Sequence, residues 1–183
     1  MSFDSLIALR IRLRSTRIPT PMQPLDFDKR LAEFGVELPP APAAYALYIP
    51  ARMSGSQLFI SGQLAWQRGQ LNHTGKLGGN ATIESVKEAG RLCGLNILSQ
   101  VKEACGGTLN RVSHCIRLTG YVNATPDCDS QAEAMDGCSA LLIDVLGDAG
   151  RHTRTTVGVG SLPLNASIEV DAVFELLAAV SVK

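Results

Sequence analysis

Three charged residues near the C-terminus have the types and spacing of a binding site. Arg154 lies in a run of small and β-branched residues, while Glu169 and Asp171 are separated by one residue in a second patterned run. Because side chains alternate between the two faces of a strand, Glu169 and Asp171 share a face. A guanidinium can hold a carboxylate through two parallel hydrogen bonds, and a carboxylate can orient a water molecule or accept its proton. The pattern indicates a site for a small carboxylate, or alternatively a structural ion pair between Arg154 and Asp171 or Glu169.

These residues are expected on a two-stranded hairpin over residues 151–176. Apolar residues alternate along the second strand and form its packed face: Ile168, Val170, Ala172, Phe174 and Leu176. The first strand places a polar, glycine-containing set on one face: Arg154, Thr156, Gly158 and Gly160. One packed face and one polar face are typical of a pocket wall, and equally of a sheet face in water.

The rest of the chain predicts a single α+β domain over residues 26–183. A short helix begins at Asp26 or Asp28, either of which can cap it, and ends before Gly35. Hydrophobic periodicity predicts these further elements in order: strands over 45–49, 57–64 and 66–71, a helix over 82–105, a strand over 110–125 and a helix over 126–150. This order predicts a mixed sheet with two helices on one face, so that the bare face must meet water or a partner.

Composition and cysteine use argue against several classes of function. Seventeen basic and 17 acidic residues cancel, and aromatic residues make up 5% of the chain, which makes a nucleic-acid surface an unfavourable interpretation. No apolar run is long enough to span a bilayer. No cluster of His, Cys and Asp has the spacing of a metal site. The five cysteines lack a C-x-x-C pair and lie among apolar residues, so we expect reduced thiols in an intracellular protein.

The first 25 residues differ in composition from the domain that follows. They contain four Arg, one Asp, several Ser and Thr, and a short amphipathic stretch. This composition resembles a mitochondrial transit peptide, and it also fits an N-terminal extension without a targeting role. The expected compartment is therefore cytoplasmic or mitochondrial.

Four stretches in consistent order resemble the reactive intermediate deaminases, also called the YjgF or RidA family. They are "LFISGQL", "TIESVKEAGRLCGLNIL", "RVSHCIRLTGYVN" and "TRTTVGVGSLPLNASIEVDAVFEL". The resemblance covers roughly residues 31–176 and is closest to a longer, less characterised subfamily. The stretches that correspond to that subfamily's markers read "RLAEFGVELPPAPAA" and "GDAGRHTRTTVGVGSLPL" here.

The resemblance implies a chorismate-mutase-like fold and a homotrimer whose bare sheet faces pack into a central barrel. Pockets then lie in the clefts between subunits. By this likeness Arg154 binds the carboxylate of a small 2-imino or 2-enamino acid, which water hydrolyses to a 2-oxo acid and ammonia without a cofactor. Ser61, Gly62 and Asp171 match other site positions of the family.

The chain departs from the deaminase pattern at several places. Thr156 stands where many deaminases have Cys, Asp136 aligns with a frequent Asn, and an N-terminal aromatic matches either Tyr45 or Tyr48. Ser61 and Gly62 could supply a hydroxyl and a close backbone N–H, or form a bulge or a packed layer. His152 lies two residues before Arg154 and could share its face, either for acid–base work or merely in water.

Three functions stay open at this point. The first is hydrolysis of small imines or enamines in intersubunit pockets, with Arg154 and Asp171 as catalytic residues and Ser61, Gly62, Thr156 and Arg154 as substrate-binding residues. The second is a trimer that binds a small carboxylate or a partner without turnover. The third is a ribonuclease or translation inhibitor, an activity credited to some relatives.

Overall fold

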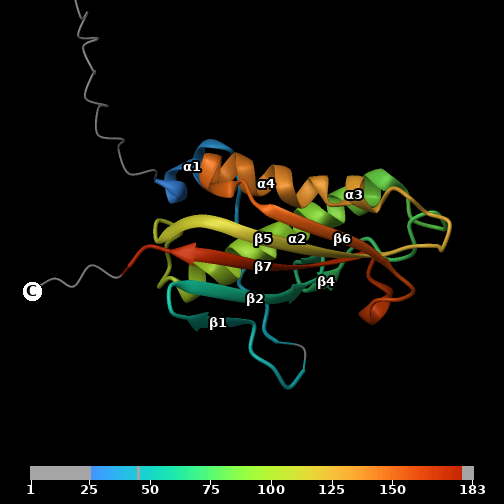
Figure 1. Cartoon of the computed structure of the whole chain (residues 1–183), viewed down its shortest axis with the longest axis horizontal. Coiled ribbons are helices and arrows are strands. Elements are labelled where there is room, and N and C mark those ends of the chain that lie inside the picture. The colour runs from blue at the N-terminus through green and yellow to red at the C-terminus, as the bar shows by residue number, and fades with distance from the viewer. Residues whose placement is uncertain (1–25, 45, 179–183) are drawn as a thin grey trace, which may run out of the picture.

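The fold is built on a five-stranded mixed sheet (Figure 1). The computed structural model describes residues 26–44 and 46–178, so the predicted N-terminal extension lies outside the described residues. In sheet order the strands are β1 (Ala51–Ser54), β2 (Gln57–Gln63), β7 (Ile168–Leu176), β5 (Val112–Asn123) and β6 (Thr153–Val159). Neighbouring strands are antiparallel except β5 and β6, which are parallel. A small separate hairpin consists of β3 (Trp66–Gln67) and β4 (Gln70–Leu71).

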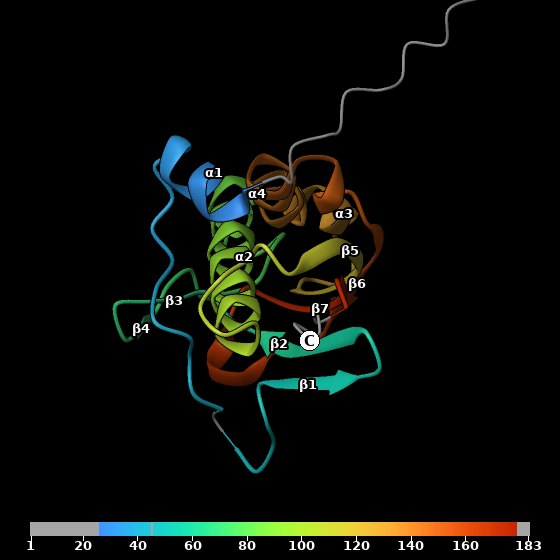
Figure 2. The same cartoon turned by 90° about the vertical axis from the view of Figure 1, so that its left-hand side faces the viewer.

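The helices cover one face of this sheet (Figure 2). They are α1 (Phe27–Glu33), α2 (Ile83–Ala104), α3 (Gln131–Ala134) and α4 (Asp136–Leu146). The Asp26 side chain caps α1 by accepting from the Lys29 N–H, and the Thr82 hydroxyl caps α2 by accepting from the Ser85 N–H. The other face of the sheet carries no helix of the described chain, and the predicted α+β arrangement with helices on one face is confirmed.

The core lies between α2 and the central strands. The predicted apolar stripe of α2 and its end is buried throughout: Val86, Ala89, Cys93, Ile97, Val101 and Cys105. It packs on the buried face of β7, whose predicted members are all at most 3% exposed: Ile168, Val170, Ala172, Phe174 and Leu176. Helices α2 and α4 approach closely, because Gly137 lies against the Lys87 carbonyl with no space for a Cβ. All five cysteines are free and four of them are buried.

The predicted hairpin over residues 151–176 is wrong, because β5 lies between β6 and β7. The segment from β5 through α3 and α4 to β6 forms a βαβ crossover, which sets β6 beside β5 in parallel. The chain then crosses to the opposite side of β5, where β7 pairs antiparallel with it. Arg154 and Asp171 are therefore on strands that do not touch.

Two other element predictions need correction. The strand expected over 45–49 is absent in the described residues 46–49, and β1 begins only after Pro50, which has no N–H to donate to a ladder. The helix expected over 126–150 begins at Gln131, is interrupted at Met135, and ends before Gly147, whose φ of 61° is unsuited to a continuing helix. In the part of the chain that the structure describes, no helix has both the length and the apolar character needed to cross a bilayer.

Candidate functional site

The predicted site residues fall into two groups on opposite faces of the sheet. Arg154 is aligned with Leu118, which is fully buried under the helices, so its side chain points toward the helix layer. Thr119, the next residue of β5, is aligned with Asp171 and belongs to the bare face. Because cross-strand partners share a face, Asp171 points away from the helices. The ion pair considered between Arg154 and Asp171 or Glu169 is not formed.

Arg154 instead binds groups from α3 and α4. Its Nη1 donates to Asp136 Oδ1 over 2.9 Å and to Ser139 Oγ over 3.1 Å, while Nη2 donates to the Ala132 carbonyl over 3.1 Å. The side chain is 27% exposed, at the free edge of the sheet. This contact places Asp136, which the resemblance aligns with a frequent Asn, beside the arginine. Three of the five guanidinium N–H groups are thus used by the protein.

Thr156 shares the helix-facing side of β6 with Arg154. Its Oγ1 is buried and has no hydrogen-bond partner among the described residues. Thr156 is aligned with Gly120 of β5, where Met135 covers the backbone so closely that a Cβ would not fit. The hydroxyl is therefore a polar group beside Arg154 whose hydrogen-bonding capacity is not used within this part of the fold.

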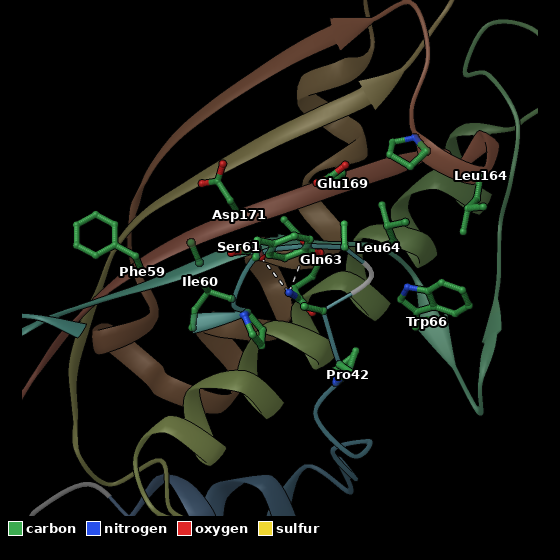
Figure 3. A pocket seen from close by; sticks show the side chains of 18 of the residues that line it. Pro42, Phe59, Ile60, Ser61, Gln63, Leu64, Trp66, Leu164, Glu169 and Asp171 are labelled. Carbon is green, nitrogen blue, oxygen red and sulfur yellow. Dashed lines mark hydrogen bonds between the residues drawn. The ribbon is translucent and has the colours of Figure 1, made fainter. Parts of the chain in front are cut away.

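The second group lines a cleft of about 710 Å³ (Figure 3). Ser61, Gly62, Glu169 and Asp171 all contribute to it, from β2 and β7. Its apolar walls come from aromatic, aliphatic and proline side chains around the mouth: Pro42, Tyr48, Phe59, Leu64, Trp66 and Leu164. None of the described residues that line the cleft is a lysine, an arginine or a histidine. The cleft is thus an apolar pocket with acidic groups on one side.

Ser61 and Gly62 lie at an irregularity of β2. The register with β7 shifts between Ile60 and Gln63, which confirms the bulge considered for this pair. The Ser61 hydroxyl donates to the Ile49 carbonyl over 2.8 Å, so a ligand would meet it as an acceptor. Gly62 lies against the Glu169 carboxylate with no room for a Cβ. The bulge therefore brings the backbone of β2 close to an acidic side chain.

Gln63 fixes the same bulge from the side of the cleft. Its Nε2 donates to the Ser61 carbonyl over 2.9 Å and to the Gly62 carbonyl over 3.3 Å (Figure 3). The side chain is buried. Gln63 is the third residue of the S-G-Q stretch, and the structure assigns it a role in holding the backbone at this turn of the strand.

The two acids of the cleft are electrostatically coupled. Burial raises the pKa of Glu169, and the negative charge of nearby Asp171 raises it further. The Tyr121 hydroxyl donates to Asp171 Oδ2 over 3.1 Å. Burial, followed by the charge of Asp171, raises the pKa of Tyr121. Glu169 therefore holds a proton to higher pH than an ordinary glutamate does, while Asp171 has a hydrogen-bond donor beside it.

The sequence did not indicate several residues in or beside the cleft. Tyr121, which does not line the cleft but donates to Asp171, was missed, although its position on the polar side of a patterned strand is a usable signal. Trp66 and Leu164 reach the cleft from loops and short elements, for which sequence periodicity gives no information. Of the two aromatic candidates, Tyr48 lines the cleft and Tyr45 lies outside the described residues. Among residues 26–44 and 46–178, no group of three His, Cys, Asp or Glu could hold a metal ion.

The fold and the cleft together define a class: a chorismate-mutase-like α+β protein with an acid-lined pocket on the bare side of its sheet. A family model described as "YjgF/chorismate_mutase-like, putative endoribonuclease" matches residues 28–176. The chain belongs to this YjgF/RidA family.

Individual relatives agree with this assignment. Protein TCP17 of Trypanosoma cruzi is 39% identical over 147 residues, which cover 80% of this chain and 91% of that protein. A solved structure of a "putative endoribonuclease" from Shewanella oneidensis is 38% identical, with a TM-score of 0.79, and the match covers 83% of this chain and all of that one. RidA from an Antarctic Psychrobacter is 21% identical with a TM-score of 0.52 over 74% of this chain and 94% of its own, a likeness of fold alone.

Proposed function

We propose that this protein binds small 2-imino and 2-enamino acids between subunits of a homotrimer and hydrolyses them to 2-oxo acids and ammonia. The observation that carries the proposal is the division of the site into two complementary halves. Arg154 is a partly exposed cation at one edge of the sheet, and the cleft that contains Asp171 has acids and apolar walls but no cation. A carboxylate ligand needs both halves, and a neighbouring copy of the chain can supply the half that one protomer lacks.

The bare face of the sheet supports a trimeric assembly. Phe59 and Val157 are each 42% exposed, and they lie on this face with Val173, Thr119 and Thr155. This face also carries polar side chains, among them Arg117 and Asp171. A sheet face that has no helix layer and exposes apolar side chains among polar ones is typical of an interface. We expect light scattering at micromolar concentration to give three times the chain mass, and a monomer would contradict the intersubunit site.

The chemistry requires little beyond positioning. Arg154 would hold the substrate carboxylate, and a water molecule would add to the carbon of the C=N bond to give a carbinolamine. A 2-enamino acid first becomes the imino acid by gaining a proton on C3 and losing one from nitrogen. Asp171 would accept the proton of the attacking water, and Glu169, with its raised pKa, would supply a proton to the imine nitrogen. As the carbinolamine collapses, its hydroxyl proton would return to Glu169 and the proton on Asp171 would pass to the departing amine, so that both acids regain their starting states. The nitrogen departs as ammonia, the oxygen of water stays as the 2-oxo group, and no cofactor takes part in the balance.

The direct test generates 2-aminoacrylate with a dehydratase and times the release of ammonia and pyruvate with and without this protein. We expect clear acceleration by the unmodified protein and strong loss with Arg154→Lys. Lysine keeps the charge but loses the two-pronged geometry, a loss of about 1.5–3 kcal/mol in ligand binding. Arg151→Lys is the matched control, because Arg151 is exposed and, among the described residues, its side chain pairs only with Asp148 three residues away. No acceleration, or equal activity of the Arg154 and Arg151 variants, would contradict the proposal.

A second candidate function comes from the family description, which includes the word endoribonuclease. Under this alternative the same preparations would degrade RNA, with a steep dependence on salt concentration. The charge balance of the chain and the acidic character of the cleft are unfavourable for a polyanion. Binding without turnover is a third outcome, in which pyruvate binds but Asp171→Asn leaves all measured rates unchanged.

A further inference from the structure

A chain of hydrogen bonds connects Arg154 to a histidine that the proposed chemistry does not use. Ser139 Oγ accepts from Arg154 Nη1 over 3.1 Å and lies 3.0 Å from His152 Nε2. On its other side, His152 Nδ1 lies 2.6 Å from the Gly150 carbonyl oxygen. All of these groups are on α4, on β6 or in the turn between them.

The Gly150 carbonyl determines how this chain must be arranged. A carbonyl oxygen only accepts, so the Nδ1 of His152 carries the proton and donates it to Gly150. In the neutral ring Nε2 is then an acceptor, and Ser139 donates its hydroxyl hydrogen to it. The lone pairs of Ser139 Oγ are therefore directed to Arg154, which can only donate. With a neutral ring, the donor and the acceptor of each hydrogen bond are therefore fixed, and the series ends at the Arg154 guanidinium.

The surroundings of His152 favour this neutral form. The ring is partly buried, and burial lowers its pKa. The hydrogen bond to the Gly150 carbonyl opposes this shift, while the nearby charge of Arg154 adds to it, so that the pKa remains lowered. The charged and titratable groups around it are Arg154 on β6, Asp136 and the buried Cys138 thiol on α4, and the exposed pair Asp148 and Arg151 at the turn. Arg117 of β5 contacts Thr155 on the opposite face of the sheet. Among the described residues, no carboxylate contacts His152, because Nδ1 lies against the Gly150 carbonyl and Nε2 against the Ser139 hydroxyl.

These hydrogen bonds leave some N–H groups of the Arg154 guanidinium available to a ligand. Asp136 and Ser139 take the two N–H groups of Nη1, and the Ala132 carbonyl takes one of Nη2. Among the described residues, Nε–H and one N–H of Nη2 have no partner. Nε and Nη2 form one of the edges of a guanidinium on which a carboxylate makes a bidentate contact. Three anchors on one planar group also fix its orientation, which removes a cost of ordering when a ligand binds.

We infer that Ser139 and His152 are positioning residues, which hold the guanidinium of Arg154 with two N–H groups directed outward for a substrate carboxylate. This inference rests on the proposed function for its biological meaning. Ser139 and His152 touch neither the substrate nor the reacting atoms, and they affect ligand binding only through the position of Arg154.

Calorimetric titration of pyruvate and 2-oxobutyrate into variants of the full chain tests the inference. We expect Ser139→Ala and His152→Phe each to weaken binding by roughly five- to tenfold, the size of one hydrogen bond. Because Ser139 and His152 both act through the same series of hydrogen bonds, the double variant should bind the acids about as weakly as either single variant. Ser139→Thr keeps the hydroxyl and should restore binding. In an Arg154→Lys background, Ser139→Ala should have no further effect.

Ser85→Ala is the matched control. Ser85 Oγ lies 3.0 Å from His73 Nδ1, so this change breaks a Ser–His contact of the same length at the start of α2. The partners of Arg154 are Asp136, Ser139 and Ala132, and neither Ser85 nor His73 is among them. Ser85→Ala should therefore leave the affinity for both acids unchanged. Equal affinity of Ser139→Ala and the unmodified protein, or losses that add in the double variant, would overturn the inference.

A crystal structure of the Ser139→Ala variant separates this inference from the proposed function. We expect the guanidinium of Arg154 to leave its position or to occupy several positions, whether or not a ligand binds. If the unmodified protein binds neither acid but the guanidinium moves in the variant, the proposed function is wrong and the positioning stands. If the acids bind and the guanidinium stays in place, the positioning is wrong and the proposed function stands.

Discussion

The guanidinium of Arg154 donates to the carboxylate of Asp136 over 2.9 Å, and not to Asp171, which lies on the opposite face of the sheet. The Asp136 carboxylate is more than half exposed, so the pair adds little to stability. Its main consequence is electrostatic, because a negative charge beside Arg154 competes with a carboxylate ligand.

This relationship gives a prediction for Asp136→Asn. The amide oxygen can still accept from Nη1, while the competing charge is removed, so the affinity for pyruvate-like acids should rise a few-fold. Isothermal calorimetry at low and at high salt measures the change, and the gain should shrink as salt increases. Weaker binding by the asparagine variant would show that Asp136 is needed as an anion to hold Arg154.

Glu169→Gln should stabilise the protein near neutral pH. Burial and Asp171 raise the pKa of Glu169 in the folded state, so the folded protein binds this proton more tightly than the unfolded chain does. The stability of the unmodified protein therefore falls as pH rises from the unfolded value of 4.5 through the raised folded value. Urea denaturation between pH 4 and pH 8 should show a gain for the glutamine variant that is absent at the acidic end and largest above that window. A constant difference across this range would contradict the assignment of the shift to Glu169.

Gly137→Ala should destabilise the fold, because a Cβ at this position would strike the backbone carbonyl of Lys87 where α4 meets α2. Backbone cannot yield as a flexible side chain does, and we expect a loss of about 1–3 kcal/mol in the free energy of unfolding, as for an overpacked core. Gly160→Ala is the control, since a Cβ there would meet nothing within 4 Å. Equal urea midpoints for the two variants would show that the helices can separate at no cost.

The sequence predicts the helix and sheet layers of the fold correctly, but it does not predict the order of the strands in the sheet. The stripe from Val86 to Cys105 and the alternation from Ile168 to Leu176 predict the faces that are buried, because burial follows periodicity directly. The position of β5 between β6 and β7 depends on the crossover through α3 and α4, which local patterns do not contain. The hairpin prediction therefore placed Arg154 and Asp171 together, although they are on opposite faces of the sheet.

For the candidate site too, local sequence patterns indicate some residues but not those that tertiary packing brings together. The group formed by Ser61, Gly62 and Asp171 could be selected from short motifs and a family resemblance, and the structure brings these residues to one cleft. Ser139, which binds Arg154, and His152, which contacts Ser139, come from a helix and a turn whose approach depends on tertiary packing. The spacing of two residues suggests that His152 shares a face with Arg154, but no periodicity in the sequence indicates that a serine of α4 would connect them.

The central claim is that Arg154 of one protomer and Asp171 of its neighbour form one site, and subunit mixing tests it most directly. Arg154→Lys and Asp171→Asn each remove one half of every site, so each variant alone should have little activity in the 2-aminoacrylate assay. When the two are unfolded, mixed in equal amounts and refolded, random assembly into a ring of three leaves about a quarter of the intersubunit sites with both native residues. The account predicts recovery of about a quarter of the activity of unmodified protein treated in the same way, and no recovery in the mixture would contradict it.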